Sequence, residues 1–174
     1  MDKRVVIIGG GFAGTKAAKS LETIFNVTLL DIKDYFEYTP SILRTITEPK
    51  VIRKIQIPYL DCLKYTVFIK GEVQNITETE VITSTHTLPY DYLIISSGSV
   101  YSTPIKDFNF IVSQRAKEMI SYAEKLRKSS SILIIGGGIV GVELAAEIAS
   151  GQAQGNAHHK SKECCQRGDQ DHDH

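Results

Sequence analysis

Apolar residues along the chain fall into short continuous runs, and several of these runs are followed by a segment of helical periodicity. The first run, Arg4 to Ile8, is β-branched and is stopped by glycine, which is typical of a buried parallel strand. Residues 12–24 then predict a helix whose packing side carries Ala13, Ala17, Ala18 and Leu21. Residues 26–30 predict a second strand, which Asp31 ends. The chain therefore opens with a complete strand–helix–strand unit.

The middle of the chain has a weaker pattern. Residues 31–59 are rich in loop signals and are interrupted by three prolines. Short strands joined by tight polar turns then suggest a small meander, with strands at Tyr65 to Ile69, Glu72 to Ile76 and Glu80 to Ser84. Residues 88–91 lead into another buried strand, Tyr92 to Ile95, and the turn Ser96 to Ser99 follows it.

The strand-then-helix pattern returns in the second half. Residues 113–128 predict an amphipathic helix with Ser113 as its N-cap and an apolar face of Ala116, Met119, Ile120, Ala123 and Leu126. Residues 132–135 predict a strand and residues 139–150 a helix. Together these elements predict an α/β fold with a mostly parallel sheet and a β-meander insert.

The last segment, residues 151–174, contains no Val, Ile, Leu, Met, Phe, Trp or Tyr. Such a segment cannot bury enough apolar surface to offset its ordering entropy, so we expect it to be disordered and foreign to the fold. An alternative is a site for a soft metal, formed by His158, His159, Cys164, Cys165, His172, Asp173 and His174. The two cysteines are adjacent rather than spaced as C-x-x-C, so we assign no metal site.

Composition narrows the class of protein. The 174 residues are 42% hydrophobic, enough for one core and part of a second, and the net charge of zero gives no electrostatic argument for nucleic acid or an anionic membrane. No apolar stretch approaches the roughly 20 residues that span a bilayer, so we expect no transmembrane segment. Three cysteines form no disulfide framework, which fits a reducing compartment and predicts a cytoplasmic location.

The candidate chemistry lies in the glycines after the first strand. Gly9, Gly11 and Gly14 form G-x-G-x-x-G, in which the glycines permit the tight turn, close approach of a phosphate and packing of the helix on the strand. The helix N-terminus offers free N–H groups to a pyrophosphate. Asp31, 22 residues beyond Gly9, is placed to accept hydrogen bonds from ribose hydroxyls. The carboxylate disfavours a 2′-phosphate, because two negative charges would meet there, so FAD or NAD fits this site better than NADP. These residues do not distinguish FAD from NAD.

The chain repeats this fingerprint at Gly136, Gly138 and Gly141, after residues 132–135. Two copies suggest two dinucleotides that exchange electrons, whereas a module with one NAD site would leave the second copy unexplained. The second unit needs a further strand ending in an acid or an arginine near residues 156–160, and those positions follow no strand-like run. We therefore expect a truncated form with an incomplete second site.

The paired fingerprints and the order of the elements between them resemble the two-dinucleotide flavoproteins of the pyridine nucleotide-disulfide oxidoreductase superfamily. Within it, the chain is most similar to the apoptosis-inducing-factor-like and type II NADH dehydrogenase-like branch. The matching stretches are Val5 to Gly14, Leu30 to Phe36, Pro40 to Arg44, Gly71 to Val73, Tyr92 to Ser99 and Ile132 to Glu147. The resemblance implies a Rossmann-like FAD-binding domain at residues 1–105, the start of an NAD(P)-binding domain at 106–150, and a non-family tail at 151–174.

The resemblance also implies roles for individual residues. The FAD phosphate loop would comprise Gly9, Gly10, Gly11, Phe12, Ala13 and Gly14. Asp31 would meet the adenosine ribose, Arg44 matches an arginine near the flavin nucleotide, and the backbone of Val73 would meet the adenine. Gly98 lies in the family's Ala-Thr-Gly turn, which reads Ser-Ser-Gly here and keeps a hydroxyl at Ser97.

Several of these residues also have a plainer interpretation. Arg44 fits a solvated surface cation equally well, Val73 a core residue of the meander, and Ser96 to Ser99 a loop that ends a strand. Glu143 matches the family pattern G-x-G-x-x-G-x-E, which places it toward the cofactor junction, or it is an ordinary helical glutamate. Cys62 has no paired cysteine beside it, so we expect a packing thiol rather than dithiol chemistry.

The function that the resemblance implies is an FAD-dependent NAD(P)H oxidoreductase that passes electrons to an acceptor such as a quinone. No dedicated catalytic residue is implied, because the flavin performs that chemistry. Peripheral membrane association in this branch usually depends on a C-terminal part that lies beyond these residues. The alternative is an inactive product that binds nucleotide weakly or associates with the full-length protein through an open sheet edge.

Overall fold

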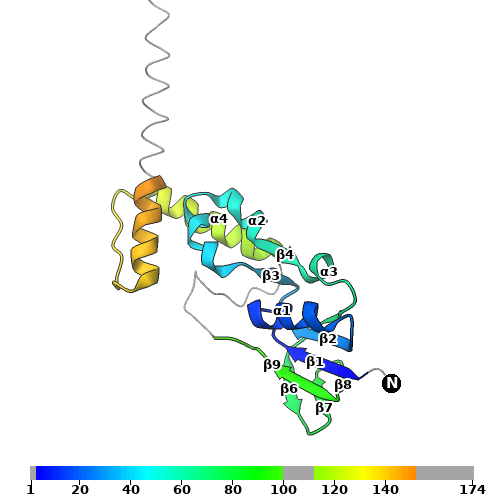
Figure 1. Ribbon diagram of the computed structural model, residues 1–174. Helices are drawn as coiled ribbons and strands as arrows, with labels where there is room; N and C mark the ends of the chain where they lie inside the picture. The colour runs from blue at the N-terminus through cyan, green and yellow to red at the C-terminus, as the bar shows by residue number, and fades with distance from the viewer. Residues whose placement is uncertain (1–2, 100–111, 152–174) are drawn as a thin grey trace, which may run out of the picture.

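The computed structural model describes residues 3–99 and 112–151 (Figure 1). Its centre is a four-stranded sheet in the order β5 (Val67–Lys70), β2 (Asn26–Asp31), β1 (Arg4–Ile8) and β9 (Tyr92–Ile95). All three pairings are parallel. The α/β class with a parallel sheet is therefore confirmed, and so are the first two strands.

Helix α1 (Phe12–Leu21) packs on one face of the sheet. The core there is formed by Val5, Ile7, Ala18, Val27, Leu29 and Tyr59. Ala18 is fully buried, because its small side chain lets the helix approach the strands closely. Ala13, expected on the packing side, is exposed instead, because it lines a hollow beside the glycine loop. The helix also ends at Leu21 rather than at Ile24, which is 69% exposed.

A three-stranded antiparallel meander packs over the other face of the sheet. It comprises β6 (Val73–Ile76), β7 (Glu80–Thr83) and β8 (Thr87–Pro89), and Val81 packs with Val6 and Leu30. The prediction of a meander is right, but the assignment of its first strand is wrong. Residues 67–70, expected in the meander, form β5 and pair in parallel with β2, because the intervening chain returns to the same end of the sheet.

The edge strand β9 also differs from its prediction. Tyr92 and Ile95 were expected to be buried, but they are 53% and 63% exposed. The reason is the position of β9, which pairs with β1 on one side and forms an edge of the described sheet on the other.

Residues 31–59, expected to be loop-rich, instead contain or begin several short elements. The strands β3 (Tyr35–Glu37) and β4 (Gln56–Pro58) pair in antiparallel fashion. The remaining elements are η1 (Thr39–Ser41), η2 (Leu43–Ile46), η3 (Pro49–Val51), α2 (Ile52–Ile55) and α3 (Tyr59–Cys62). Prolines occupy the first turns of η1 and η3, where a missing N–H costs nothing.

Helix α4 (Val112–Lys128) packs against these short elements (Figure 1). Its Met119 joins a second core with Ile42, Leu43, Ile46, Ile52 and Ile55. The predicted helix is confirmed, although Ile120 of its expected apolar face is 39% exposed. The side chain of Ser113, the expected N-cap, lies outside what the structure describes.

The strand predicted at residues 132–135 does not form. These residues have no regular secondary structure, and Leu133 and Ile135 are 84% and 90% exposed. A parallel strand needs hydrogen-bonded neighbours, and no described segment pairs with this one. Residues 139–151 form the predicted helix, and its Leu144 packs against the second core.

The expected disordered tail and its candidate metal ligands fall in residues 152–174, outside the described part. Gly151, assigned to the tail, instead ends the helix at 139–151. Within residues 3–99 and 112–151, no helix is both long and apolar enough to span a bilayer. The cytoplasmic location, the peripheral membrane association and the domain boundaries stay predictions.

Candidate cofactor-binding site

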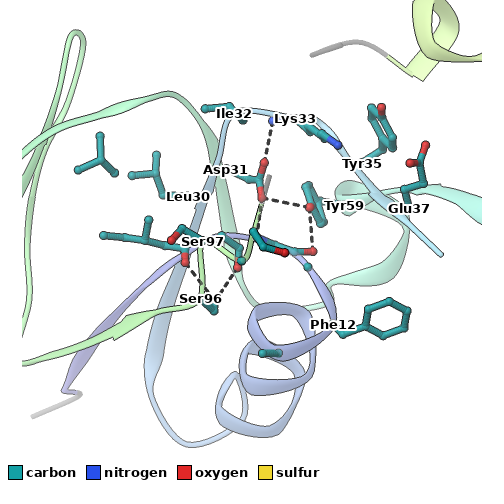
Figure 2. Close-up of a pocket in the computed structure, with 18 of the residues that line it drawn as sticks. Phe12, Leu30, Asp31, Ile32, Lys33, Tyr35, Glu37, Tyr59, Ser96 and Ser97 are labelled. Atoms are coloured by element: carbon teal, nitrogen blue, oxygen red, sulfur yellow. Dashed lines mark hydrogen bonds between the residues drawn. The ribbon is translucent and has the colours of Figure 1, made fainter. Parts of the chain in front are cut away.

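A cavity of about 500 Å³ opens at the carboxyl ends of β1, β2 and β9 (Figure 2). It is lined by residues 9–13 of the glycine loop, by residues 30–33 at the end of β2 and by residues 96–99 after β9. Its volume lies within the range of roughly 300–1,000 Å³ for small-molecule and cofactor pockets. Ligands of open α/β sheets bind at this edge, outside the carboxyl ends of the strands.

The glycine loop is tightly packed on the inside and open toward the cavity. Gly9 has φ +95°, and a Cβ there would collide with the carbonyl of Ser96. A Cβ on Gly14 would lie 2.7 Å from the Ser96 hydroxyl, so helix α1 can pack this closely only with glycine. A Cβ on Gly11 would instead have nothing within 4 Å and would project into open space.

The N-terminus of α1 has no side-chain cap. Gly11 is the N-cap residue and its carbonyl accepts from Thr15 N–H at 3.0 Å, but no side chain bonds the first N–H groups of the helix. These groups can therefore donate to an anion. The open cradle above Gly11 fits a phosphate, and this supports a dinucleotide at the loop.

Asp31 is held firmly at the end of β2. Its Oδ2 accepts from Gly10 N–H at 2.5 Å and its Oδ1 from Lys33 N–H at 2.8 Å (Figure 2). An ionised carboxylate has about four lone-pair sites, so acceptor capacity remains for ligand hydroxyls. Asp31 lines the cavity, where the sequence predicted a ribose-binding acid.

Tyr59 is the site residue that sequence reasoning missed. Its side chain comes from α3 and is 2% exposed, and its hydroxyl lies 2.9 Å from the Gly10 carbonyl and 3.4 Å from Asp31 Oδ2 (Figure 2). Burial, and next the negative charge of Asp31, raise the pKa of Tyr59 well above its ordinary value. The phenol therefore stays protonated. No local motif marks this residue, which tertiary packing alone brings to the loop.

The turn after β9 closes the opposite side. Ser96 donates its hydroxyl to the Gly9 carbonyl at 2.8 Å, and Ser97 and Gly98 line the cavity. Val73 also lines the cavity while its side chain packs against the core under the meander, so both interpretations of this residue agree with its position. Phe12 packs edge-on against Phe36, with ring centroids 5.1 Å apart.

Arg44 lies outside the cavity lining. Its guanidinium bonds Glu48 at 2.9 Å on the surface of η2, as a solvated cation would. Its match to an arginine near the flavin stays a prediction.

The second fingerprint repeats the local geometry of the first. Gly136 has φ +110°, and a Cβ on Gly141 would collide with the Gly136 carbonyl, just as Gly14 meets Gly9. The carbonyl of Gly138 accepts from Val142 N–H at 3.1 Å, as Gly11 accepts from Thr15. Gly136, Gly138, Gly141 and the exposed Glu143 lie outside the lining of the first cavity. The turn forms although residues 132–135 before it form no strand.

Cys62 packs against the core under α1. Burial raises the pKa of its thiol, which leaves little reactive thiolate near neutral pH. The prediction of a packing thiol is confirmed.

The chain is similar to known proteins in sequence and in fold. The family model for pyridine nucleotide-disulphide oxidoreductases matches residues 3–170. Apoptosis-inducing factor homolog B of Dictyostelium discoideum is 38% identical over 151 residues, which cover 84% of this chain and 38% of that protein. Demethylphylloquinone reductase NdbB of Synechocystis is 29% identical, over 83% of this chain and 42% of that protein. The structure of NDH2 from Plasmodium falciparum in complex with NADH superposes with a TM-score of 0.66 and 21% identity, over 87% and 37% of the two chains.

The chain thus spans about two fifths of the length of these relatives. The likeness to NDH2 concerns the fold, whereas the family match covers nearly the whole chain. The glycine loop, the carboxylate at the end of β2 and the family match lead to one conclusion: the chain belongs to the pyridine nucleotide-disulphide oxidoreductase family, in its apoptosis-inducing-factor-like and type II NADH dehydrogenase-like branch.

Proposed function

We propose that the cavity at the first fingerprint binds FAD, with the pyrophosphate at the N-terminus of α1 and the adenosine ribose at Asp31. One observation carries this proposal: a single cavity joins an uncapped helix N-terminus to an anchored carboxylate. The donors of the helix meet the phosphate charge, and the acceptors of Asp31 meet the ribose hydroxyls.

The extent of the cavity allows a whole dinucleotide at this site, and the family resemblance favours FAD over NAD. From Asp31 the lining continues past Phe12 to Tyr35, Glu37 and Thr39. The adenosine diphosphate half of a dinucleotide occupies the space between the loop and Asp31. The second half then extends toward β3 and η1, which overlap the stretches Leu30 to Phe36 and Pro40 to Arg44 that match the family.

The proposed activity of the whole protein is transfer of electrons from NAD(P)H to a quinone-like acceptor. A bound flavin supplies this chemistry by accepting electrons from the nicotinamide and passing them on. The second fingerprint, with Gly136, Gly138 and Gly141, is the proposed position of NAD(P)H. The name of the Synechocystis relative, a demethylphylloquinone reductase, supports a quinone as the acceptor.

The test uses the full 174-residue chain and a matched pair of glycine variants. We expect the purified chain to bind FAD, seen as flavin absorbance that stays with the protein on gel filtration. Gly11→Leu should abolish that binding without loss of helical structure, because its side chain fills only the open cradle. Gly137→Leu is the control, since Gly137 also has open space around it but lies outside the first cavity.

Turnover is a separate measurement. Oxidation of NADH in the presence of a water-dispersed quinone would support the complete activity, and binding of FAD without turnover would limit the chain to the cofactor-binding role. Failure of the chain to bind FAD at concentrations well above the micromolar range would refute the proposal.

A second role, association through the sheet edge, has one observation in its favour. Tyr92 and Ile95 of β9 are more than half exposed at an edge of the described sheet, and such edges pair with other chains. Replacing Tyr92 by lysine should then lower the apparent mass in sedimentation velocity. An unchanged mass would remove this role.

A further inference from the structure

Three elements meet beneath the cavity: the loop after β1, the end of β2 and the short helix α3. Tyr59, at the start of α3, is fixed on both sides. Its ring packs on Phe68 with centroids 4.8 Å apart, and its N–H donates to the Asp34 carbonyl at 3.2 Å. The hydroxyl is thereby held within hydrogen-bond reach of the Gly10 carbonyl and of Asp31, and Figure 2 shows Tyr59 beside Asp31.

The hydroxyl carries one proton and faces two acceptors. The nearer is the Gly10 carbonyl at 2.9 Å, and Asp31 Oδ2 is at 3.4 Å. The Gly10 carbonyl also accepts from the Thr15 hydroxyl at 2.7 Å. Both lone pairs of this carbonyl are therefore used, and the orientation of the Gly10 residue is fixed from below.

Gly10 in turn holds the carboxylate. Its N–H donates to Asp31 Oδ2, so the orientation of Gly10 sets the orientation of Asp31. The contact is also steric: a Cβ on Gly10 would lie 2.8 Å from Cε1 of Tyr59 and would collide with its hydroxyl. Gly10 is not one of the three fingerprint glycines, and the tyrosine beneath it explains why glycine is needed here.

We propose that Tyr59 is a positioning residue of the cofactor site. It acts through Gly10 to aim Asp31 at the two hydroxyls of the adenosine ribose. The inference rests on the proposed function, because it needs an adenine dinucleotide at this loop. Its specific consequence is selectivity: Tyr59 contributes to the binding of ligands that carry ribose hydroxyls and not to the binding of the phosphates.

The experiment compares ADP with 2′,3′-dideoxy-ADP as competitors of FAD bound to the full chain, followed by flavin fluorescence. Tyr59→Phe keeps the ring and removes only the hydroxyl. We expect it to raise the Kd of ADP about 10-fold, which equals about 1.4 kcal/mol, and to change the Kd of the dideoxy compound less than about 2-fold.

Tyr90→Phe is the matched control. Tyr90 also donates its hydroxyl to a backbone carbonyl, that of Thr77 at 2.7 Å, but it lies in the meander outside the cavity lining. We expect no change in either Kd. In an Asp31→Asn background, Tyr59→Phe should add nothing further to the loss of ADP affinity, because the two residues act through one contact.

A second variant covers the case in which Tyr59→Phe folds poorly. Thr15→Val removes the other hydroxyl that the Gly10 carbonyl accepts, lies outside the cavity lining and should produce the same loss, confined to ADP. If the variants weaken the binding of ADP and of the dideoxy compound equally, or weaken neither, the positioning role is wrong. The proposed function still stands in that case, provided that the unaltered chain binds FAD. An unaltered chain that binds no FAD would refute the proposed function and this inference with it.

Discussion

Replacing Arg115 by methionine should strongly destabilise the protein. Its guanidinium is fully buried, with Nε 3.4 Å from Glu37 Oε2 and Nη1 3.5 Å from Glu118. The side chain of Glu37 is 4% exposed, and its Oε2 also accepts from the Gln56 amide at 2.8 Å. Its Oε1 has no hydrogen-bond partner within the described ranges. This ion pair joins α4 to the β3–β4 pair.

The magnitude follows from what each substitution leaves behind. Arg115→Met removes the cation beside the buried Glu37 carboxylate, whose remaining donor among the described residues is the Gln56 amide. Breaking a buried ion pair in this way costs about 3–5 kcal/mol. Adding Glu37→Gln removes the unpaired negative charge. The double variant should therefore be at least about 2 kcal/mol more stable than Arg115→Met alone, although it contains one more substitution.

The assay is urea unfolding of the full chain, followed by far-UV circular dichroism and extrapolated to water. Arg127→Met is the control on the same helix: its guanidinium donates to the Thr47 carbonyl at 3.0 Å in an exposed position, and its loss should cost less than about 1 kcal/mol. A double variant as unstable as Arg115→Met would refute the reasoning, because the cost would then not come from the unpaired carboxylate.

Three further predictions concern pH, the glycines and the thiol. Partial desolvation acts to raise the pKa of Glu22, but hydrogen bonds from the backbone of residues 64–66 and from a hydroxyl there lower it overall. Glu22→Gln should therefore lower the free energy of unfolding above pH 4.5, and the difference from the unaltered chain should disappear as the pH falls below that value. Urea titrations at several pH values would show this. Gly98→Ala should lower the free energy of unfolding by about 1 kcal/mol, because alanine is strained at the φ of +73°. Gly9→Ala should lower it clearly more, because its Cβ also collides with the backbone, and equal losses in melting temperature would contradict this. With the two tail cysteines replaced by serine, Cys62 should react with iodoacetamide more slowly in the folded chain than in urea, because its thiol packs beside the core. Equal rates measured by mass spectrometry would contradict this.

The opening of the fold could be predicted from the sequence because its signals are local. A β-branched run, three glycines at fixed spacing and an acid at the end of the next strand are all encoded within residues 4–31. The structure gathers Gly9, Gly11 and Asp31 around one cavity, as that pattern requires. The periodicity of α4 was equally local, and its helix formed as expected.

Other features depended on partners that are distant in the sequence. Residues 67–70 have the composition of a meander strand, and only the free edge of β2 decides that they join the parallel sheet. Residues 132–135 have a clear strand pattern but remain unpaired in the described chain, because a pattern states which residues suit a strand and not which neighbour is present.

The cofactor site also has one part that the sequence predicts and another that depends on tertiary packing. The sequence by itself determined the turn that presents backbone N–H groups to a phosphate, because glycine spacing fixes that turn locally. Only the tertiary structure decided that Arg44 lies outside the cavity, that Glu37 is buried against Arg115, and that Tyr59 lies beneath the loop. The last two contacts join residues 78 and 49 positions apart and follow from how the elements pack together, which no single stretch of sequence encodes.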